Sequence, residues 1–147
     1  FCLCYFNGTN YYLINPSAAA SSTFVSSQIA IPTTAGTGGL STGQAHGFGA
    51  VPTEYSGYLV NTTTEGGYNV GDKISLTQVT FHGAHSGGDS FDGPAFGVKA
   101  DATNVYAVFN GPLYGADSTS YRLSTTTNAV GVTFTPANWK IVIVAHK

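Results

Sequence analysis

Short extended segments separated by turn residues run through the chain and leave little room for helices. Runs rich in β-branched and aromatic residues recur at spacings of about 8 to 15 residues, and most end at Gly, Pro, Asn or Asp. About eight to ten such strands can be marked, and no segment of helical length has apolar residues at helical spacing. The pattern predicts an all-β fold, an antiparallel β-sandwich or jelly-roll-like domain.

Several strands can be placed from the pattern. Residues 139–145 carry Ile, Val, Ile and Val in succession, which predicts a strand buried on both faces. Residues 33–43 are rich in Gly and Thr and predict a surface loop or a linker. The other predicted strands are residues 1–6 and 11–14 as a hairpin, then 24–31, 58–64, a strand through residues 74–81, 96–100, 104–109 and, more weakly, 121–124.

The length allows one hydrophobic core. A chain of 147 residues with 42% hydrophobic residues is expected to form a single folded unit. We expect residues 1–43 to form a hairpin and a connecting segment packed on a head of residues 44–147. The sequence has no initiator Met and no leader, so we expect it to be a piece of a longer protein.

Charge and hydropathy exclude two classes of partner. Only 8% of the residues are charged, against about 25% in an ordinary soluble domain, and the net charge is -2. The 5 Lys and Arg residues are scattered, so nucleic-acid binding is not expected. The longest apolar run, at residues 141–145, is far shorter than the roughly 20 residues that cross a bilayer, so membrane insertion is not expected either.

Three motifs in order carry a family resemblance. The first is His46-Gly47-Phe48-Gly49 followed by Pro52. The second is Glu65-Gly66-Gly67-Tyr68-Asn69-Val70-Gly71-Asp72-Lys73-Ile74, and the third is Thr135-Pro136-Ala137-Asn138-Trp139-Lys140-Ile141-Val142-Ile143. Together they resemble the C-terminal receptor-binding tip domains of tailed-bacteriophage tail fibres, over the chain from about residue 44 to the end.

The resemblance implies a homotrimer at the tip of a fibre, extracellular on the virion. An upstream shaft would join it to the tail, and the tip would bind a glycan or an outer-membrane protein on the host surface. A trimer would also cover apolar surface that a lone domain of low charge would expose.

Two segments are the best candidates for receptor contact, the predicted loops at residues 82–94 and 111–122. Tyr rings stack on sugars, and polar side chains bond to sugar hydroxyls. His and Asp are also metal-ligand types, but spacing in a glycine-rich loop does not bring them together, so we predict no metal and no cofactor. The expected contact residues are His82, His85, Asp89, Asp92, Tyr114, Tyr121 and Arg122.

No catalytic residues are predicted, and the protein is not expected to be an enzyme. Glu65 and Asp72 flank a turn, where acidic residues commonly serve the backbone. Trp139 precedes the most apolar strand and is expected to anchor the core or an interface. Two alternatives stay open: a virion decoration or assembly protein that binds only particle components, and a tip that depolymerises polysaccharide by a carboxylate pair.

Overall fold

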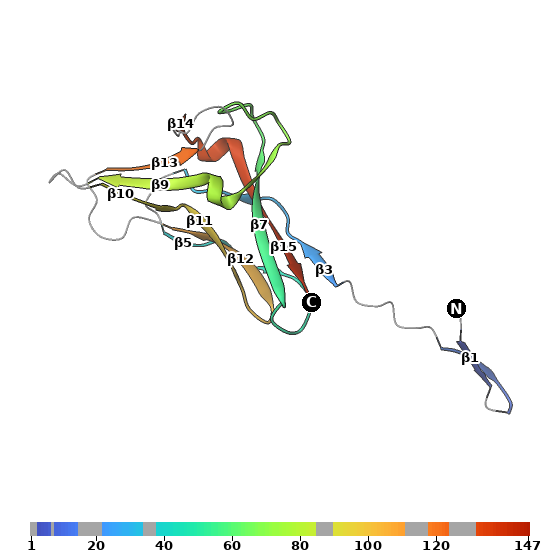
Figure 1. The fold of residues 1–147 in the computed structure, drawn as a ribbon. Coiled ribbons are helices and arrows are strands. Elements are labelled where there is room, and N and C mark those ends of the chain that lie inside the picture. The colour runs from blue at the N-terminus through green and yellow to red at the C-terminus, as the bar shows by residue number, and fades with distance from the viewer. Residues whose placement is uncertain are drawn as a thin grey trace.

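The computed structural model describes residues 3–6, 8–14, 22–33, 38–84, 90–110, 118–123 and 132–147. In this part of the chain the strands form several antiparallel sheets, which confirms the all-β prediction (Figure 1). The helices there are short 3-10 turns, and none is long and apolar enough to span a bilayer. The elements are β1 (Leu3–Phe6), β2 (Tyr11–Ile14), β3 (Thr23–Val25), β4 (Ile29–Ala30), β5 (Gly39–Leu40), β6 (Gln44–Ala45), β7 (Glu54–Asn61), β8 (Lys73–Ser75), η1 (Leu76–Gln78), β9 (Val79–Ala84), β10 (Ser90–Pro94), β11 (Phe96–Ala100), β12 (Asn104–Phe109), β13 (Ser118–Leu123), β14 (Val132–Thr133), η2 (Pro136–Asn138) and β15 (Trp139–His146).

The first two strands form the predicted hairpin. β1 pairs antiparallel with β2, with Leu3 opposite Ile14. Gly8 in the connection has a φ of 93°, a conformation that glycine adopts without a Cβ clash. The next strands, β3, β4 and β5, pair with β15 and β12. The packing of the hairpin on the head and the boundary after residue 43 stay predictions.

β15 is the central strand of a five-stranded sheet. β7 pairs with it from Trp139 to His146, while β3 and β4 pair along its other edge. Trp139, Ile141, Ile143 and Ala145 are buried on the core side, whereas on the other side Val142 is buried and Lys140, Val144 and His146 are partly exposed. The prediction of a strand buried on both faces is therefore confirmed for its core side and only in part for the other.

A serine interrupts the predicted strand at residues 24–31, which is two strands in the structure. Ser26 lies between β3 and β4, and its backbone N–H donates to the Ile143 carbonyl at 2.8 Å. Its hydroxyl oxygen accepts the hydrogen bond of the Ile143 N–H, also at 2.8 Å. The Ser26 hydroxyl thus replaces the backbone carbonyl that would accept this hydrogen bond in a regular strand. The hydrogen bonds to β15 continue, although the chain forms a bulge at Ser26.

β11 and β12 form a pair with the predicted bounds. Val105, Ala107 and Phe109 alternate as the buried residues of β12. β5 and β6 add to β12, and Leu40 lies opposite Val108. The prediction of a loop or linker at residues 33–43 is therefore wrong for Gly39–Leu40, because the backbone of these residues pairs with β12, a partner distant in the chain.

The predicted strand through residues 74–81 is two strands in different sheets. The 3-10 helix η1 separates β8 from β9, and the Ser75 Oγ accepts a hydrogen bond from the Thr77 N–H at 3.2 Å. Leu76 is nevertheless buried. The apolar alternation that suggested one strand therefore comes from two strands and a buried turn between them.

The predicted loop at residues 82–94 is largely a hairpin. Residues up to Ala84 belong to β9, and Ser90–Pro94 form β10, paired with it. Gly93 packs beneath the Phe81 ring, where an added Cβ would lie 2.8 Å from the ring carbons. The glycine therefore marks close packing rather than a loop, which is why its presence misled the prediction.

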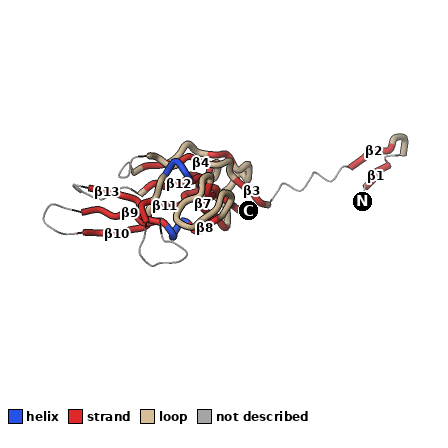
Figure 2. Tube along the Cα trace, turned by 90° about the horizontal axis from the view of Figure 1, so that it is seen from above, coloured by secondary structure: helices blue, strands red, loops and turns tan. Residues whose placement is uncertain are grey.

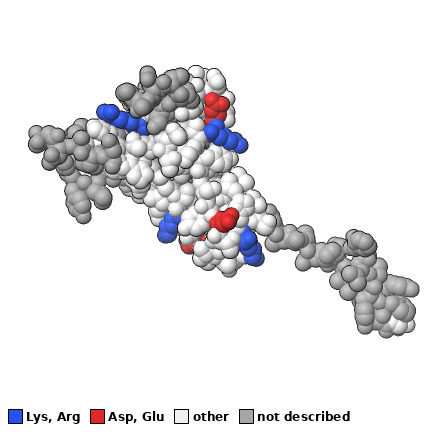
Figure 3. Space-filling view, viewed as in Figure 1, with Lys and Arg blue, Asp and Glu red and all other residues white. Residues whose placement is uncertain are grey.

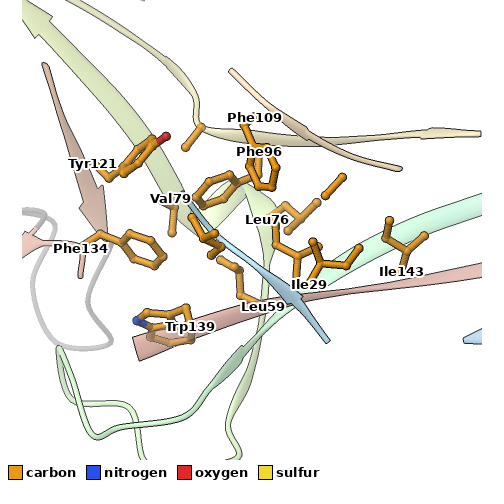
Figure 4. Close-up of a cluster of buried hydrophobic side chains, with 14 of the residues drawn as sticks. Ile29, Leu59, Leu76, Val79, Phe96, Phe109, Tyr121, Phe134, Trp139 and Ile143 are labelled. Atoms are coloured by element: carbon orange, nitrogen blue, oxygen red, sulfur yellow. The ribbon is translucent and has the colours of Figure 1, made fainter. Parts of the chain in front are cut away.

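The sheets enclose one core. β10, β9, β13 and β14 form a four-stranded sheet, and β10, β9 and β13 lie side by side at one end of the molecule (Figure 2). Trp139, Phe134, Tyr121 and Phe96 pack ring against ring between the sheets, at centroid distances of 5.8, 6.0 and 5.4 Å in that order (Figure 4). Trp139 is fully buried, so the expectation of a core anchor is confirmed.

Candidate functional site

The structure describes the side chains of three of the seven expected contact residues, namely His82, Tyr121 and Arg122. Asp92 lies in β10 opposite His82, but its side chain is outside the described part. His85, Asp89 and Tyr114 lie outside the described residues. The site can therefore be built from the strands β9 and β13 and their neighbours.

Strand register brings two of the expected residues to one surface. On β9, Val79 and Phe81 are buried in the core, so Thr80 and His82 point to the other face of the sheet. On β13, Arg122 lies directly opposite Thr80 and is exposed.

The same face extends to the flanking strands. Arg122 lies opposite Thr133 of β14, and Thr80 lies opposite Pro94 of β10. His82 is half-buried, while Pro94 and Thr133 are exposed. We call this surface the polar face, made of Thr80, His82, Pro94, Arg122 and Thr133.

Tyr121 does not belong to this surface, and its prediction as an exposed contact is wrong. It is 3% exposed, and its ring contacts the rings of Phe96 and Phe134. Burial also raises the pKa of the Tyr121 phenol, and the hydroxyl has no hydrogen-bond partner among the residues that the structure describes. Adjacent residues of a strand point to opposite faces, so Tyr121 and Arg122 could not both line one surface.

Arg122 is the only arginine of the chain. Its guanidinium has five N–H donors in a planar fork that fits a carboxylate, phosphate or sulfate group. The hydroxyls of Thr80 and Thr133 flank it across the neighbouring strands, where facing Cβ atoms are about 4.5–5.5 Å apart. These two threonines were missed from the sequence, since only the strand register shows them as neighbours of Arg122.

Other charged groups serve the scaffold. Glu65 accepts hydrogen bonds from the Thr135 N–H at 2.8 Å and from the Trp139 indole at 2.7 Å. Asp72 accepts one from the Asn69 N–H at 2.8 Å. Both acidic residues of the second motif thus hold loops in place, as expected from their position beside a turn.

A second carboxylate centre holds the turn between β11 and β12. Asp101 accepts hydrogen bonds from the Thr103 and Asn104 N–H groups at 2.8 Å each and from the Tyr106 hydroxyl at 2.9 Å. The bonds from Asn104 and Thr103, and then that from Tyr106, lower the pKa of Asp101. The carboxylate is thus used to shape a turn.

His46 of the first motif is a buried structural residue. Its Nδ1 accepts the Phe48 N–H at 3.2 Å, and its Nε2 lies 3.0 Å from the Asp101 carbonyl oxygen. Because a backbone N–H can only donate, the proton of this imidazole is on Nε2 and is donated to that carbonyl. The motif therefore ties the segment before β7 to the turn after β11.

The segment Gly39-Leu40-Ser41-Thr42-Gly43 matches the sequence pattern of a nucleophile elbow. An elbow needs a strand followed by a helix, whereas here β5 is followed by β6. The Ser41 Oγ accepts the Ala107 N–H at 3.0 Å and donates to the Thr42 carbonyl at 3.2 Å. This serine is a link between strands.

Charged groups are sparse over the view in Figure 3, where small groups of either sign are separated by uncharged surface. Within the described ranges, no three His, Cys, Asp or Glu side chains gather as metal ligands would. The described side chains of the polar face therefore offer one guanidinium, one imidazole and hydroxyl groups, while the side chain of Asp92, opposite His82, lies outside the described part.

Comparison of the chain with protein-family models, curated protein sequences and solved structures found no match.

Proposed function

We propose that this chain is the receptor-binding tip of a tailed-bacteriophage fibre, a non-enzymatic adhesin that attaches the virion to a host surface glycan or outer-membrane protein. The three ordered motifs and the all-β fold support this. The observation that carries the binding role is the polar face, where His82 and Arg122 lie on the side of the sheet that faces away from the core.

Assembly as a homotrimer, joined to a shaft and the tail, is part of the proposal. The support is the side of the β15 sheet that faces away from the core. Val142 lies there opposite Tyr58, and Val144 lies between Val25 and Ser56. Val142 is buried but is not part of the core cluster, while Val25 is 56% exposed. We call these residues, with Val60, the valine face. Val60 lies opposite Lys140 and Lys73, so charged residues border the valine face at this end. We assign the valine face to contact between copies of this chain.

The mass of the chain in solution tests the assembly. Sedimentation equilibrium should give three times the chain mass, and Val25→Lys should lower it. Val51→Lys is the matched control, because Val51 is also 56% exposed but precedes β7 and is not on the valine face. A monomer at micromolar concentration, or an equal effect of both variants, would contradict this assignment.

Attachment is tested with the labelled chain on a panel of bacterial cells. The chain should bind a subset of strains, and Arg122→Ala should reduce that binding. Lys147→Gln removes a charge of the same sign outside the polar face and should have no effect. Binding to no strain, together with binding to purified tail particles, would favour a decoration or assembly protein instead. Release of reducing sugar from host polysaccharide would show a depolymerase.

A further inference from the structure

We propose that the polar face binds an acidic polysaccharide, with the Arg122 guanidinium paired to a carboxylate or sulfate group of the polymer. This inference rests on the proposed attachment function and names the chemical class of its receptor.

The first argument is the position of the cation. β13 is hydrogen-bonded to β9 on one side and β14 on the other, and Arg122 has a partner residue on both. The Arg122 backbone therefore lies in a strand that is hydrogen-bonded to a neighbouring strand on each side, and it does not lie in a loop. A cation held in this way loses less entropy on binding than one on a free loop.

The second argument compares Arg122 with two of the four lysines. The Lys73 ammonium lies 5.1 Å from the Tyr58 ring centroid, and that of Lys99 lies 5.2 Å from the Tyr106 ring centroid. Each is held by an aromatic partner on its own domain. Arg122 is exposed, and the described residues directly opposite it are threonines, which carry no charge.

The third argument is the chemistry around the guanidinium. The Thr80 and Thr133 hydroxyls both donate and accept hydrogen bonds, as sugar hydroxyls require. His82 follows Thr80 by two residues on the same face and adds a ring and a polar nitrogen. A guanidinium that can bind an anion, with threonine hydroxyls beside it, suits a sugar that carries an acidic group.

The shape of the surface favours a polymer. Thr80, Arg122 and Thr133 lie in one row across neighbouring strands, and His82 extends it along β9. Small molecules are usually bound in concave pockets that bury most of their surface. An extended polymer with repeated acidic groups can instead lie along this row of side chains, and when one acidic group leaves Arg122 a neighbouring group can bind it.

The test measures binding of the full chain to immobilised polygalacturonate, dextran sulfate, carboxyl-reduced polygalacturonate and neutral dextran. The chain should bind at least one acidic polymer more tightly than both neutral ones, and added salt should weaken this binding. Polygalacturonate and dextran sulfate separate a carboxylate from a sulfate preference. Equal binding to acidic and neutral polymers would overturn the proposal.

Substitutions of Arg122 test whether this residue binds the acidic polymer. Arg122→Gln should weaken acidic-polymer binding at least about tenfold, and Arg122→Lys should weaken it less, because lysine keeps the charge but loses the bidentate fork. Lys147→Gln is the control for charge, and an unchanged thermal midpoint shows that each variant is folded. An equal loss in Lys147→Gln and Arg122→Gln would reject the site.

The two proposals fail in different ways. If the chain binds cells and Arg122→Gln binds them equally well, the acidic-polysaccharide inference is wrong while attachment stands. If the chain binds neither cells nor acidic polymers, both are wrong.

Discussion

The indole Nε1 of Trp139 donates a 2.7 Å hydrogen bond to the Glu65 carboxylate, although 74 residues separate the two in the chain. The same carboxylate accepts the Thr135 N–H at 2.8 Å and lies 3.4 Å from the Asn138 side-chain amide. Tyr68, which exchanges backbone hydrogen bonds with Glu65, packs edge-on against Trp139. These contacts, which we call the clasp, join the second sequence motif to the third.

Removal of this carboxylate should destabilise the fold. Glu65→Ala leaves the Trp139 indole and the Thr135 N–H without their acceptor, and we expect a loss of about 2–4 kcal/mol in the free energy of unfolding. Glu65→Gln keeps an acceptor oxygen and should lose about half as much. Urea unfolding followed by tryptophan fluorescence measures both. Glu54→Gln, at an exposed position of β7, is the control, and a similar loss there would argue against the clasp.

Two glycines give a matched test of packing between strands. A Cβ added at Gly93 would lie 2.8 Å from the Phe81 ring, whereas one at Gly97 would lie 3.6 Å from the Val108 Cβ. Gly93→Ala should therefore cost about 1–3 kcal/mol by overpacking, and Gly97→Ala should be neutral or slightly stabilising because it restricts the unfolded chain. Thermal unfolding of the two variants should rank them in this order. The reverse order would show that the Phe81 ring moves aside without cost.

The buried phenol of Tyr121 predicts a dependence on alkaline pH. Its raised pKa means that the folded state disfavours the phenolate, so stability is complete below the usual value of 10.0 and falls as the pH rises through the folded pKa. Tyr121→Phe should remove this part of the alkaline loss. It should cost little stability at pH 7, because the hydroxyl has no hydrogen-bond partner within the described part of the chain. A large loss at pH 7 would show that the hydroxyl is bonded in solution.

Asp101 predicts a dependence on acidic pH with the opposite sign. Its pKa is lowered in the folded state, so its contribution is present above the usual value of 3.8 and is lost as the pH falls through the folded pKa. Asp101→Asn should flatten the stability profile in this acidic window and should destabilise the turn at neutral pH. Chemical unfolding between pH 2 and pH 6 compares the two proteins. Parallel profiles would mean that other carboxylates control acid unfolding.

The sequence was most informative where local pattern and burial agree. Phe96–Ala100 and Asn104–Phe109 were predicted with their bounds because β-branched and aromatic residues end at an Asp-initiated turn. The terminal strand was predicted because its run of Ile and Val suits a strand covered on both faces. In these segments the preferred local conformation is also the one that the core requires.

The failures have a common physical cause, which is that partners distant in the chain decide the outcome. The sequence predicts a loop at Gly93, although the Phe81 ring across the hairpin leaves no room for a larger residue there. Leu76 was placed in a strand, although the chain turns at that residue to change sheets. The sequence predicts His82 and Arg122 as contact residues, and both lie on the polar face. It also predicts Tyr121, which is buried in the core, and it does not indicate Thr80 or Thr133.

The pairing of β3 with β15 has a topological consequence. The Lys147 N–H donates to the Ser22 carbonyl at 2.9 Å, and Thr23 Oγ1 lies 3.1 Å from His146 Nδ1, so the two ends of the sheet region meet beside β3 (Figure 1). A peptide link of a few residues from Lys147 to Ser22 would close this part of the chain into a ring without stretching it. The packing of the strands therefore does not depend on where the chain begins. A circularly permuted chain, with new termini at another exposed turn, can form the same core.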